Sequence, residues 1–155
     1  ALIHKGHNRI AFAGDRDSCQ SFYERWQGYH QAMADNGKPE LLLDFKYTTE
    51  YYSTADFSRQ LSGLKELPTA FVCANDSIAH SAYMLCFPPY QSYRDLDVTG
   101  FDNTRAFIAS IPHCSTVDIR LDELGQALGE SILWRIQNPH HVCRCLRLTT
   151  RPILE

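Results

Sequence analysis

The feature that most constrains this chain is a short apolar run that ends in a polar dipeptide. Residues 69–74 (Thr-Ala-Phe-Val-Cys-Ala) follow a proline, and an apolar run bounded in this way predicts a buried strand. Asn75 and Asp76 come next, and Asp76 is a favourable N-cap for the helix indicated by the apolar residues from Ile78 onward. A strand, a polar turn and a helix in succession are typical of α/β sheets, where ligands bind just beyond the carboxyl ends of the strands.

Asn75 has two interpretations at this position. Its amide offers one acceptor and two donors to a small polar ligand at the carboxyl end of a strand. An asparagine in the same place also forms Asx-turns that only close the joint between a strand and a helix. These residues alone support both interpretations equally.

Composition and charge exclude several classes of protein. The 155 residues are 44% hydrophobic and 21% charged, as expected of one globular domain with a core. The net charge is −3 and Lys and Arg do not cluster, which argues against nucleic-acid binding by this chain. No apolar run is long enough to span a membrane, and no signal-peptide pattern is present. The six cysteines follow no common zinc spacing, so we expect reduced thiols and no bound metal. Reduced thiols fit a cytoplasmic protein. We also expect no cofactor.

Strand and helix patterns alternate along the chain. Apolar runs predict strands over residues 9–13, 41–45, 69–74 and 97–101, with a short extended piece over 116–119. Apolar residues at helical spacing predict helices over residues 22–33, 53–64, 78–85 and 121–136. The order βαβαβαβ predicts an α/β fold, a mainly parallel sheet with right-handed crossovers and helices on both faces.

Five short motifs follow one another from end to end of the chain. They are Gly-His-Asn-Arg-Ile (6–10), Arg-Trp-Gln-Gly-Tyr (25–29), Pro-Thr-Ala with Ala-Asn-Asp (68–76), Asp-Val-Thr-Gly-Phe-Asp-Asn (97–103), and Ser-Thr-Val with Leu-Gly (115–125). In these motifs the chain resembles the effector-binding domain of the lactose-repressor/galactose-repressor family of bacterial transcription regulators. That family has the type I periplasmic-binding-protein fold. The chain departs from the family pattern before the fourth strand, where residues 88–93 replace the usual Gly-Leu-x-Val-Pro.

The resemblance implies a domain arrangement. Residues 1–155 are expected to be a fragment of the effector-binding domain, mostly its C-terminal subdomain. A helix over about 119–137 would pack on an N-terminal subdomain that this chain lacks, and the DNA-binding headpiece would be absent as well. Because its partner is missing, the apolar stripe of this helix is expected to be uncovered and to promote self-association. Leu121 is expected to serve in core or hinge packing.

The resemblance also implies which residues bind the effector: Arg25, Asn75 and Asp102, with an aromatic at Tyr51 or Tyr52. Their chemistry suits a sugar-like ligand, because Arg and Asp bind neighbouring hydroxyls through charge-assisted hydrogen bonds. By spacing alone Arg25 is an ordinary surface residue and Asp102 belongs to a plain turn. The motifs favour the binding interpretation for both.

Family members dimerise, and the resemblance implies the dimer surface as well. It places His80, Met84, Phe107, Ala109 and Ser110 in a homodimer interface; the alternative is an ordinary exposed helix face. Closure of the two subdomains on effector would change the affinity of the missing headpiece for operator DNA. The sequence does not name the effector, since relatives sense sugars, sugar phosphates, nucleosides and purines.

The sequence disfavours three other functions. The segment His140–Cys145 contains Cys-x-Cys beside two histidines, but it lacks a second ligand pair and is better explained as a loop. The chain has no nucleophile elbow, P-loop, zinc-protease or dinucleotide motif, so we expect no enzyme. The main alternative is a periplasmic sugar-binding protein of a transport system, which six unpaired-looking cysteines fit poorly.

Overall fold

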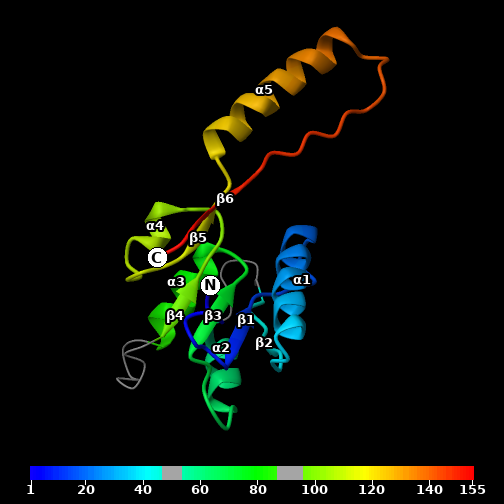
Figure 1. The fold of residues 1–155 in the computed structure, drawn as a ribbon. Coiled ribbons are helices and arrows are strands. Elements are labelled where there is room, and N and C mark those ends of the chain that lie inside the picture. The colour runs from blue at the N-terminus through cyan, green and yellow to red at the C-terminus, as the bar shows by residue number, and fades with distance from the viewer. Residues whose placement is uncertain (47–53, 87–95) are drawn as a thin grey trace.

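The computed structural model describes residues 1–46, 54–86 and 96–155 (Figure 1). Eleven elements follow in the order β1 (Ile10–Ala13), α1 (Gln20–Asp35), β2 (Leu41–Leu43), α2 (Thr54–Ser62), β3 (Ala70–Cys73), α3 (Asp76–Cys86), β4 (Asp97–Thr99), α4 (Arg105–Ile108), β5 (Thr116–Asp118), α5 (Leu121–Gln137) and β6 (Arg151–Ile153). The predicted alternation of strands and helices is confirmed, except that the sequence did not predict α4. Strands β2 and β4 are each two residues shorter than predicted.

Four strands form one parallel sheet in the order β2-β1-β3-β4. Strand β1 lies between β2 and β3, with Ala11 opposite both Leu41 and Phe71. Parallel strands are buried on both faces, which explains why β1 and β3 are almost continuously apolar. Helix α1 covers one face of this sheet, and α2 and α3 lie together on the other (Figure 1). The predicted α/β class is therefore confirmed.

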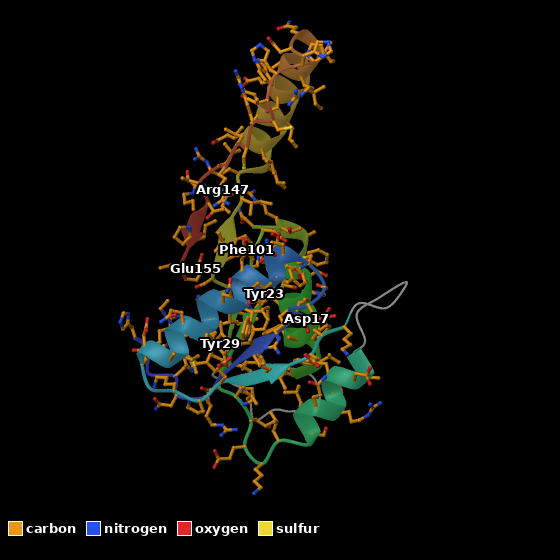
Figure 2. All side chains as sticks on the ribbon, turned by 90° about the vertical axis from the view of Figure 1, so that its right-hand side faces the viewer. Asp17, Tyr23, Tyr29, Phe101, Arg147 and Glu155 are labelled. Atoms are coloured by element: carbon orange, nitrogen blue, oxygen red, sulfur yellow. The ribbon has the colours of Figure 1, made fainter. Side chains whose placement is uncertain are left out.

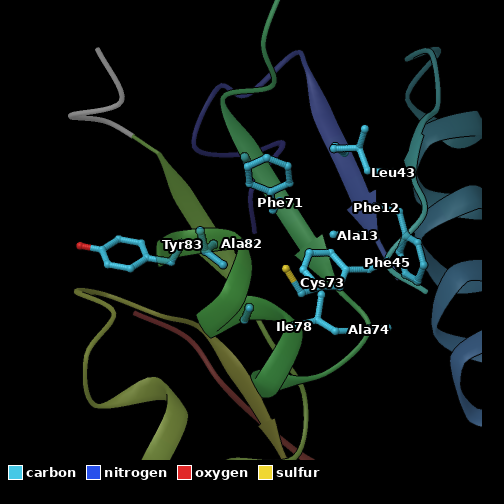
Figure 3. Close-up of a cluster of buried hydrophobic side chains, with 14 of the residues drawn as sticks. Phe12, Ala13, Leu43, Phe45, Phe71, Cys73, Ala74, Ile78, Ala82 and Tyr83 are labelled. Carbon is cyan, nitrogen blue, oxygen red and sulfur yellow. The ribbon is translucent and has the colours of Figure 1, made fainter. Parts of the chain in front are cut away.

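Figure 3 shows the part of the hydrophobic core that lies beside the sheet and α3, and residues of α1 and α2 belong to the same buried cluster. Phenylalanine rings from neighbouring elements meet there: the centroids of Phe45 and Phe57 are 4.6 Å apart, and those of Phe57 and Phe71 are 6.0 Å apart. On the opposite face, the hydroxyl of Tyr29 donates to the carbonyl oxygen of Ile10 at 2.9 Å. This bond satisfies the one polar group that Tyr29 brings into the interior.

The backbone of β4 pairs with β3, whereas the residues after β4 bond to the β5 region. The N–H groups of Gly100 and Asp102 donate to the carbonyl oxygens of Ser115 and Val117, at 2.8 and 2.9 Å. Strand β5 then pairs antiparallel with β6. The segment that follows β4 is thus held by the β5 region, and this positions residues 100–104 at the carboxyl end of the sheet.

Helix α3 is capped by a different residue than predicted. The Oδ1 of Asn75 accepts a hydrogen bond from the N–H of Ile78 at 2.9 Å, which is the contact of an N-cap residue. Asp76 is the first residue of the helix and is 1% exposed. The prediction that Asp76 caps the helix was wrong, because its carboxylate points into the interior.

Helix α5 projects away from the sheet (Figure 1). None of its residues is buried, and Leu121 is 60% exposed. Leu121 is therefore not part of the core, contrary to one half of the expectation; it lines a polar cavity with Asp102 and Asp118, and its role in hinge packing stays a prediction. In the part of the chain that the structure describes, no helix has the length and apolar character needed to cross a membrane.

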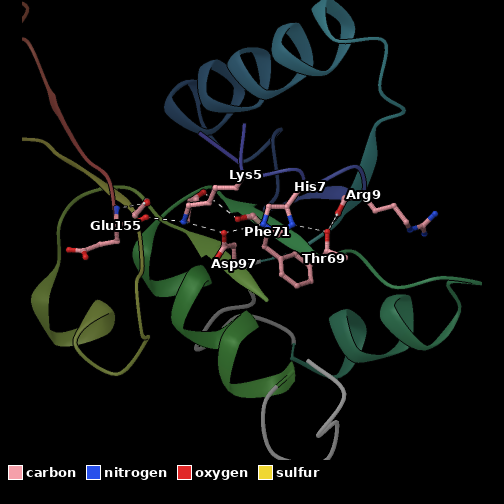
Figure 4. A network of polar contacts seen from close by, with 9 residues as sticks. Lys5, His7, Arg9, Thr69, Phe71, Asp97 and Glu155 are labelled. Atoms are coloured by element: carbon pink, nitrogen blue, oxygen red, sulfur yellow. Dashed lines mark hydrogen bonds and ion pairs between the residues drawn. The ribbon is translucent and has the colours of Figure 1, made fainter. Parts of the chain in front are cut away.

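A polar network joins the chain ends at the amino edge of the sheet (Figure 4). His7 forms hydrogen bonds with Thr69 Oγ1 at 2.9 Å and with Asp97 Oδ2 at 3.0 Å. Lys5 Nζ lies 3.2 Å from the same Asp97 oxygen and donates to the carbonyl oxygen of Glu155 at 2.8 Å. The network ties the segment before β1 to the starts of β3 and β4.

Candidate functional site

Arg25 connects α1 to the carboxyl ends of two strands. Its Nη1 donates to the carbonyl oxygen of Ala74, just after β3, at 2.6 Å. Its Nη2 donates to Asp102 Oδ1, after β4, at 3.3 Å. The guanidinium lies over the ring of Phe101, 3.7 Å from the centroid. The structure thus brings Arg25 and Asp102 together at the edge where the sequence predicts a ligand.

Asp102 has an unusual backbone conformation. Its φ is 108°, and that of the following Asn103 is 58°. Residues other than glycine rarely adopt positive φ, and such residues cluster at ligand sites where the surroundings hold them in place. The pairing of Asp102 with the β5 region supplies one such restraint.

The Arg25–Asp102 pair is only partly accessible to solvent, with side chains 19% and 28% exposed. Burial lowers the pKa of Arg25, and the charge of Asp102 only partly opposes this shift. Burial likewise raises the pKa of Asp102, against the effect of Arg25 and with a further contribution from Asp76. For Arg25 desolvation outweighs what Asp102 restores, and for Asp102 desolvation and the charge of Asp76 together outweigh what Arg25 restores. Additional hydrogen bonds from a bound ligand would therefore stabilise both charged groups.

Asn75 is next to Ala74, whose carbonyl oxygen accepts the hydrogen bond from Arg25. The Oδ1 of Asn75 caps α3, so the helix-joint interpretation of this residue is correct for that atom. A ligand contact would use the amide nitrogen, Nδ2. Capping and ligand binding involve different atoms of one amide and are compatible.

Phe101 is the aromatic residue that the sequence analysis did not place in the site. It lies beside α1, below the base of α5 (Figure 2). The signal was present in the motif, since Phe101 stands between Gly100 and Asp102. The aromatic expected at Tyr51 or Tyr52 lies outside the described residues.

A polar cavity of about 640 Å³ opens beside Asp102 at the base of α5. Most of its other walls are charged side chains, from Arg105, Asp118, Arg120, Asp122, Glu123 and Arg151. Two ion pairs cross these walls, Arg120–Glu123 at 2.6 Å and Arg151–Asp118 at 2.9 Å. An apolar cavity of about 330 Å³ reaches Arg25 from the other side, between α1 and the sheet. Only the first offers the polar groups that a hydroxylated ligand needs.

The residues predicted for a dimer surface lie on α3, on α4 and just after α4. The rings of His80 and Phe107 are 5.9 Å apart, which joins the two helices. Met84, Ala109 and Ser110 are exposed. The structure therefore brings His80 and Phe107 together, and the role of the five residues in dimerisation stays a prediction.

Three of the six cysteines are buried in the core. All six are free, and Cys73, Cys86 and Cys114 are buried. Burial raises the pKa of Cys86 and of Cys114 to about 12 and raises that of Cys73, so these thiols stay protonated and unreactive. The segment His140–Cys145 is exposed, between α5 and β6, as predicted for a loop. No group of three or more His, Cys, Asp or Glu with metal-site geometry occurs in the described ranges.

Residues 1–154 match the family model described as a periplasmic binding protein-like domain. The chain belongs to this family. It is 30% identical to the ribose operon repressor of Haemophilus influenzae, over 100% of this chain and 47% of that protein. The chain spans about half the length of the curated relatives it matches.

Solved structures show the same fold. A LacI family transcriptional regulator from Enterococcus faecium, with bound ribose, superposes with a TM-score of 0.79 at 22% identity, covering 98% of this chain and 57% of that one. A dimeric Lac repressor with a C-terminal deletion gives a TM-score of 0.78 at 23% identity, covering 98% of this chain and 56% of that one. The resemblance predicted from the five motifs is confirmed.

Proposed function

We propose that this chain is the ligand-sensing and dimerising part of a transcriptional regulator of the lactose-repressor/galactose-repressor type. It binds a small sugar-like effector at the carboxyl edge of the parallel sheet. The observation that carries the proposal is the Arg25–Asp102 pair, half-buried with Arg25 over the ring of Phe101 and with Asp102 in the wall of the polar cavity. The domain senses the ligand and performs no catalysis.

The chemistry of the pair matches a polyol. A guanidinium donates and a carboxylate accepts, so together they bind two adjacent hydroxyls of one sugar. The face of Phe101 and the amide of Asn75 adjoin the pair. The ribose operon repressor among the relatives and the bound ribose in a structural neighbour support a sugar as the effector class.

The remainder of the binding cleft is proposed to come from an N-terminal subdomain outside this chain. The exposed apolar side chains of α5 would pack on it, and the DNA-binding headpiece would precede it. Effector binding would close the two subdomains and shift a dimer between states of different operator affinity. A protein that acts on operator DNA works in the cytoplasm, which agrees with six free cysteines. The alternative, a periplasmic sugar-binding protein for transport, is disfavoured because the curated relatives are repressors and regulators.

Nuclear magnetic resonance titration tests the binding site directly. The ¹⁵N-labelled 155-residue chain is titrated with D-ribose, ribose 5-phosphate, adenosine and hypoxanthine in turn. Because half of the proposed cleft is missing, we expect weak binding, with Kd of about 1 mM or above. D-ribose should move the resonances of Arg25, Asn75, Phe101 and Asp102, and the other three compounds should move them less.

Two variants distinguish a site effect from a general one. Asp102→Asn removes the carboxylate that accepts from Arg25, and should abolish the D-ribose response. Glu66→Gln removes a carboxylate from the exposed Arg9–Glu66 pair at the opposite edge of the sheet, and should leave the response unchanged. Resonances that move only elsewhere, or equally in Asp102→Asn, would contradict the proposed site.

A further inference from the structure

Asp76 is a buried acidic residue that the ligand-binding role above does not use. It is 1% exposed, and both of its carboxylate oxygens accept hydrogen bonds. Oδ2 accepts from the N–H of Thr104 at 2.6 Å, and Oδ1 accepts from the hydroxyl of Thr116 at 2.7 Å. A buried carboxylate is retained only where such bonds replace its lost hydration.

These bonds lie around Asp102 and Asn103, the two site residues with positive φ. The N–H of Asp76 donates to the carbonyl oxygen of Phe101 at 2.9 Å. The hydroxyl of Thr116 also accepts from the N–H of Asn103 at 3.3 Å. The Asp76–Thr116 pair therefore holds the backbone immediately before Asp102 and the two amides immediately after it.

The space around Asp76 shows that its position is closely determined. A Cβ atom added to Gly100 would lie 2.0 Å from Asp76 Oδ1 and 3.1 Å from Asp76 Cα. The carboxylate thus packs directly against the backbone that leads from β4 to Asp102, and any side chain at position 100 would displace it.

We propose that Asp76 and Thr116 are positioning residues that hold Asp102 in its positive-φ conformation, facing Arg25, and thereby set the affinity for a hydroxylated ligand. The role in affinity rests on the proposed function, whereas the role in holding the backbone does not. Neither residue touches the ligand in this account. Without the pair, residues 101–104 relax toward ordinary backbone conformations and the Asp102 carboxylate leaves Arg25.

Substitutions at Thr116 test this without changing the charge of the site. Thr116→Val keeps the shape and removes the hydroxyl, and Thr116→Ser keeps the hydroxyl as a conservative rescue. Amide ¹⁵N relaxation of the ligand-free chain is measured first. We expect order parameters of Asp102 and Asn103 near 0.85 in the wild type and in Thr116→Ser, and below about 0.6 in Thr116→Val. Unchanged order parameters in a folded Thr116→Val would overturn the positioning role.

D-ribose titration of the same variants then tests the consequence. Thr116→Val should weaken binding about tenfold, the equivalent of about 1.4 kcal/mol, and Thr116→Ser should bind as the wild type does. If Asp102 becomes more mobile but the affinity for ribose does not change, the proposed effect of these residues on ligand affinity is overturned. Absence of ribose binding in the wild type would instead refute the proposed function and leave the relaxation result standing.

Asp76→Asn is the second variant, needed in case Thr116→Val does not fold. An asparagine keeps the shape but accepts at only one of the two positions. The amides after Asp102 should again gain mobility, while a thermal melt confirms a folded chain. A folded Asp76→Asn variant with a rigid Asp102 would also contradict the proposal.

Discussion

Helices α3 and α5 both carry apolar residues at helical spacing, but they lie in opposite environments. Helix α3 packs against the sheet, α2 and α4 and buries six residues, whereas α5 buries none. Helix α5 is also the longer of the two, with 17 residues against 11. An amphipathic pattern therefore predicts that a helix forms and which face is apolar, but not what covers that face.

The largest expected difference concerns stability. Phe71 in β3 is fully buried, so Phe71→Ala should lower the free energy of unfolding by about 3–5 kcal/mol. Ile136 at the end of α5 is 70% exposed, so Ile136→Ala should change it by no more than about 0.5 kcal/mol. Urea unfolding of both variants measures the two free energies of unfolding. Equal losses of this free energy in the two variants would mean that α5 has a packing partner in solution.

The exposed stripe of α5 should also promote self-association. Light scattering of the 155-residue chain at micromolar concentration should show species larger than a dimer, and Ile132→Lys should reduce them. Burial of one such side chain contributes about 1.5–3 kcal/mol, so we expect at least about tenfold weaker association. Gln126→Lys adds the same charge on the opposite face of the helix and serves as the control. A monomer in the wild type would end this interpretation.

Two glycine substitutions compare close packing with open space. The Cβ added by Gly100→Ala meets the carboxylate and the Cα of Asp76, so this change should cost about 1–3 kcal/mol in the free energy of unfolding. Gly129 in α5 has no atom within 4 Å of an added Cβ, so Gly129→Ala should stabilise the helix by about 0.5–1 kcal/mol. Urea unfolding for the first, and hydrogen exchange of the α5 amides for the second, measure these effects. A tolerated Gly100→Ala would show that Asp76 can move.

The smallest expected effect is the pH dependence of the stability that Asp97 contributes at the amino edge of the sheet. Partial burial raises the pKa of Asp97, but hydrogen bonds from His7 and Lys5 and their charges outweigh it, so the net pKa is lowered. A lowered carboxyl pKa stabilises the fold above the unfolded value of 3.8, and this stability is lost as the pH falls through the folded value. Its size should be within about 1 kcal/mol, as for other partly exposed pairs.

The difference in unfolding free energy between wild type and Asp97→Asn, followed from pH 6 to pH 2, isolates this contribution. The difference should shrink as the pH falls. Asp102 works in the opposite direction, because its raised pKa favours the fold at low pH. A constant difference between the two proteins would show that Asp97 is not stabilised by its partners.

Much of the fold could be predicted because its signals are local. Strand β3 follows from an apolar run, α1 from its periodicity, and the order of elements leads to a parallel sheet. Arg25 and Asp102 were predicted as site residues through their motifs, and the structure brings them together. What could not be predicted were contacts between residues distant in sequence, such as Arg25 with Phe101 and with the carbonyl of Ala74.

By itself, the sequence determined the order of the elements other than α4, the family, and the chemical types of the candidate site residues. Only the tertiary structure decided that Asn75 caps α3 and that Asp76 is buried against Gly100. It also decided that Leu121 is exposed. The physical reason is the same in each case. A side chain's propensity is local, but its hydrogen-bond partners and its burial depend on which distant segments pack beside it, as the β5 region does beside the end of β4.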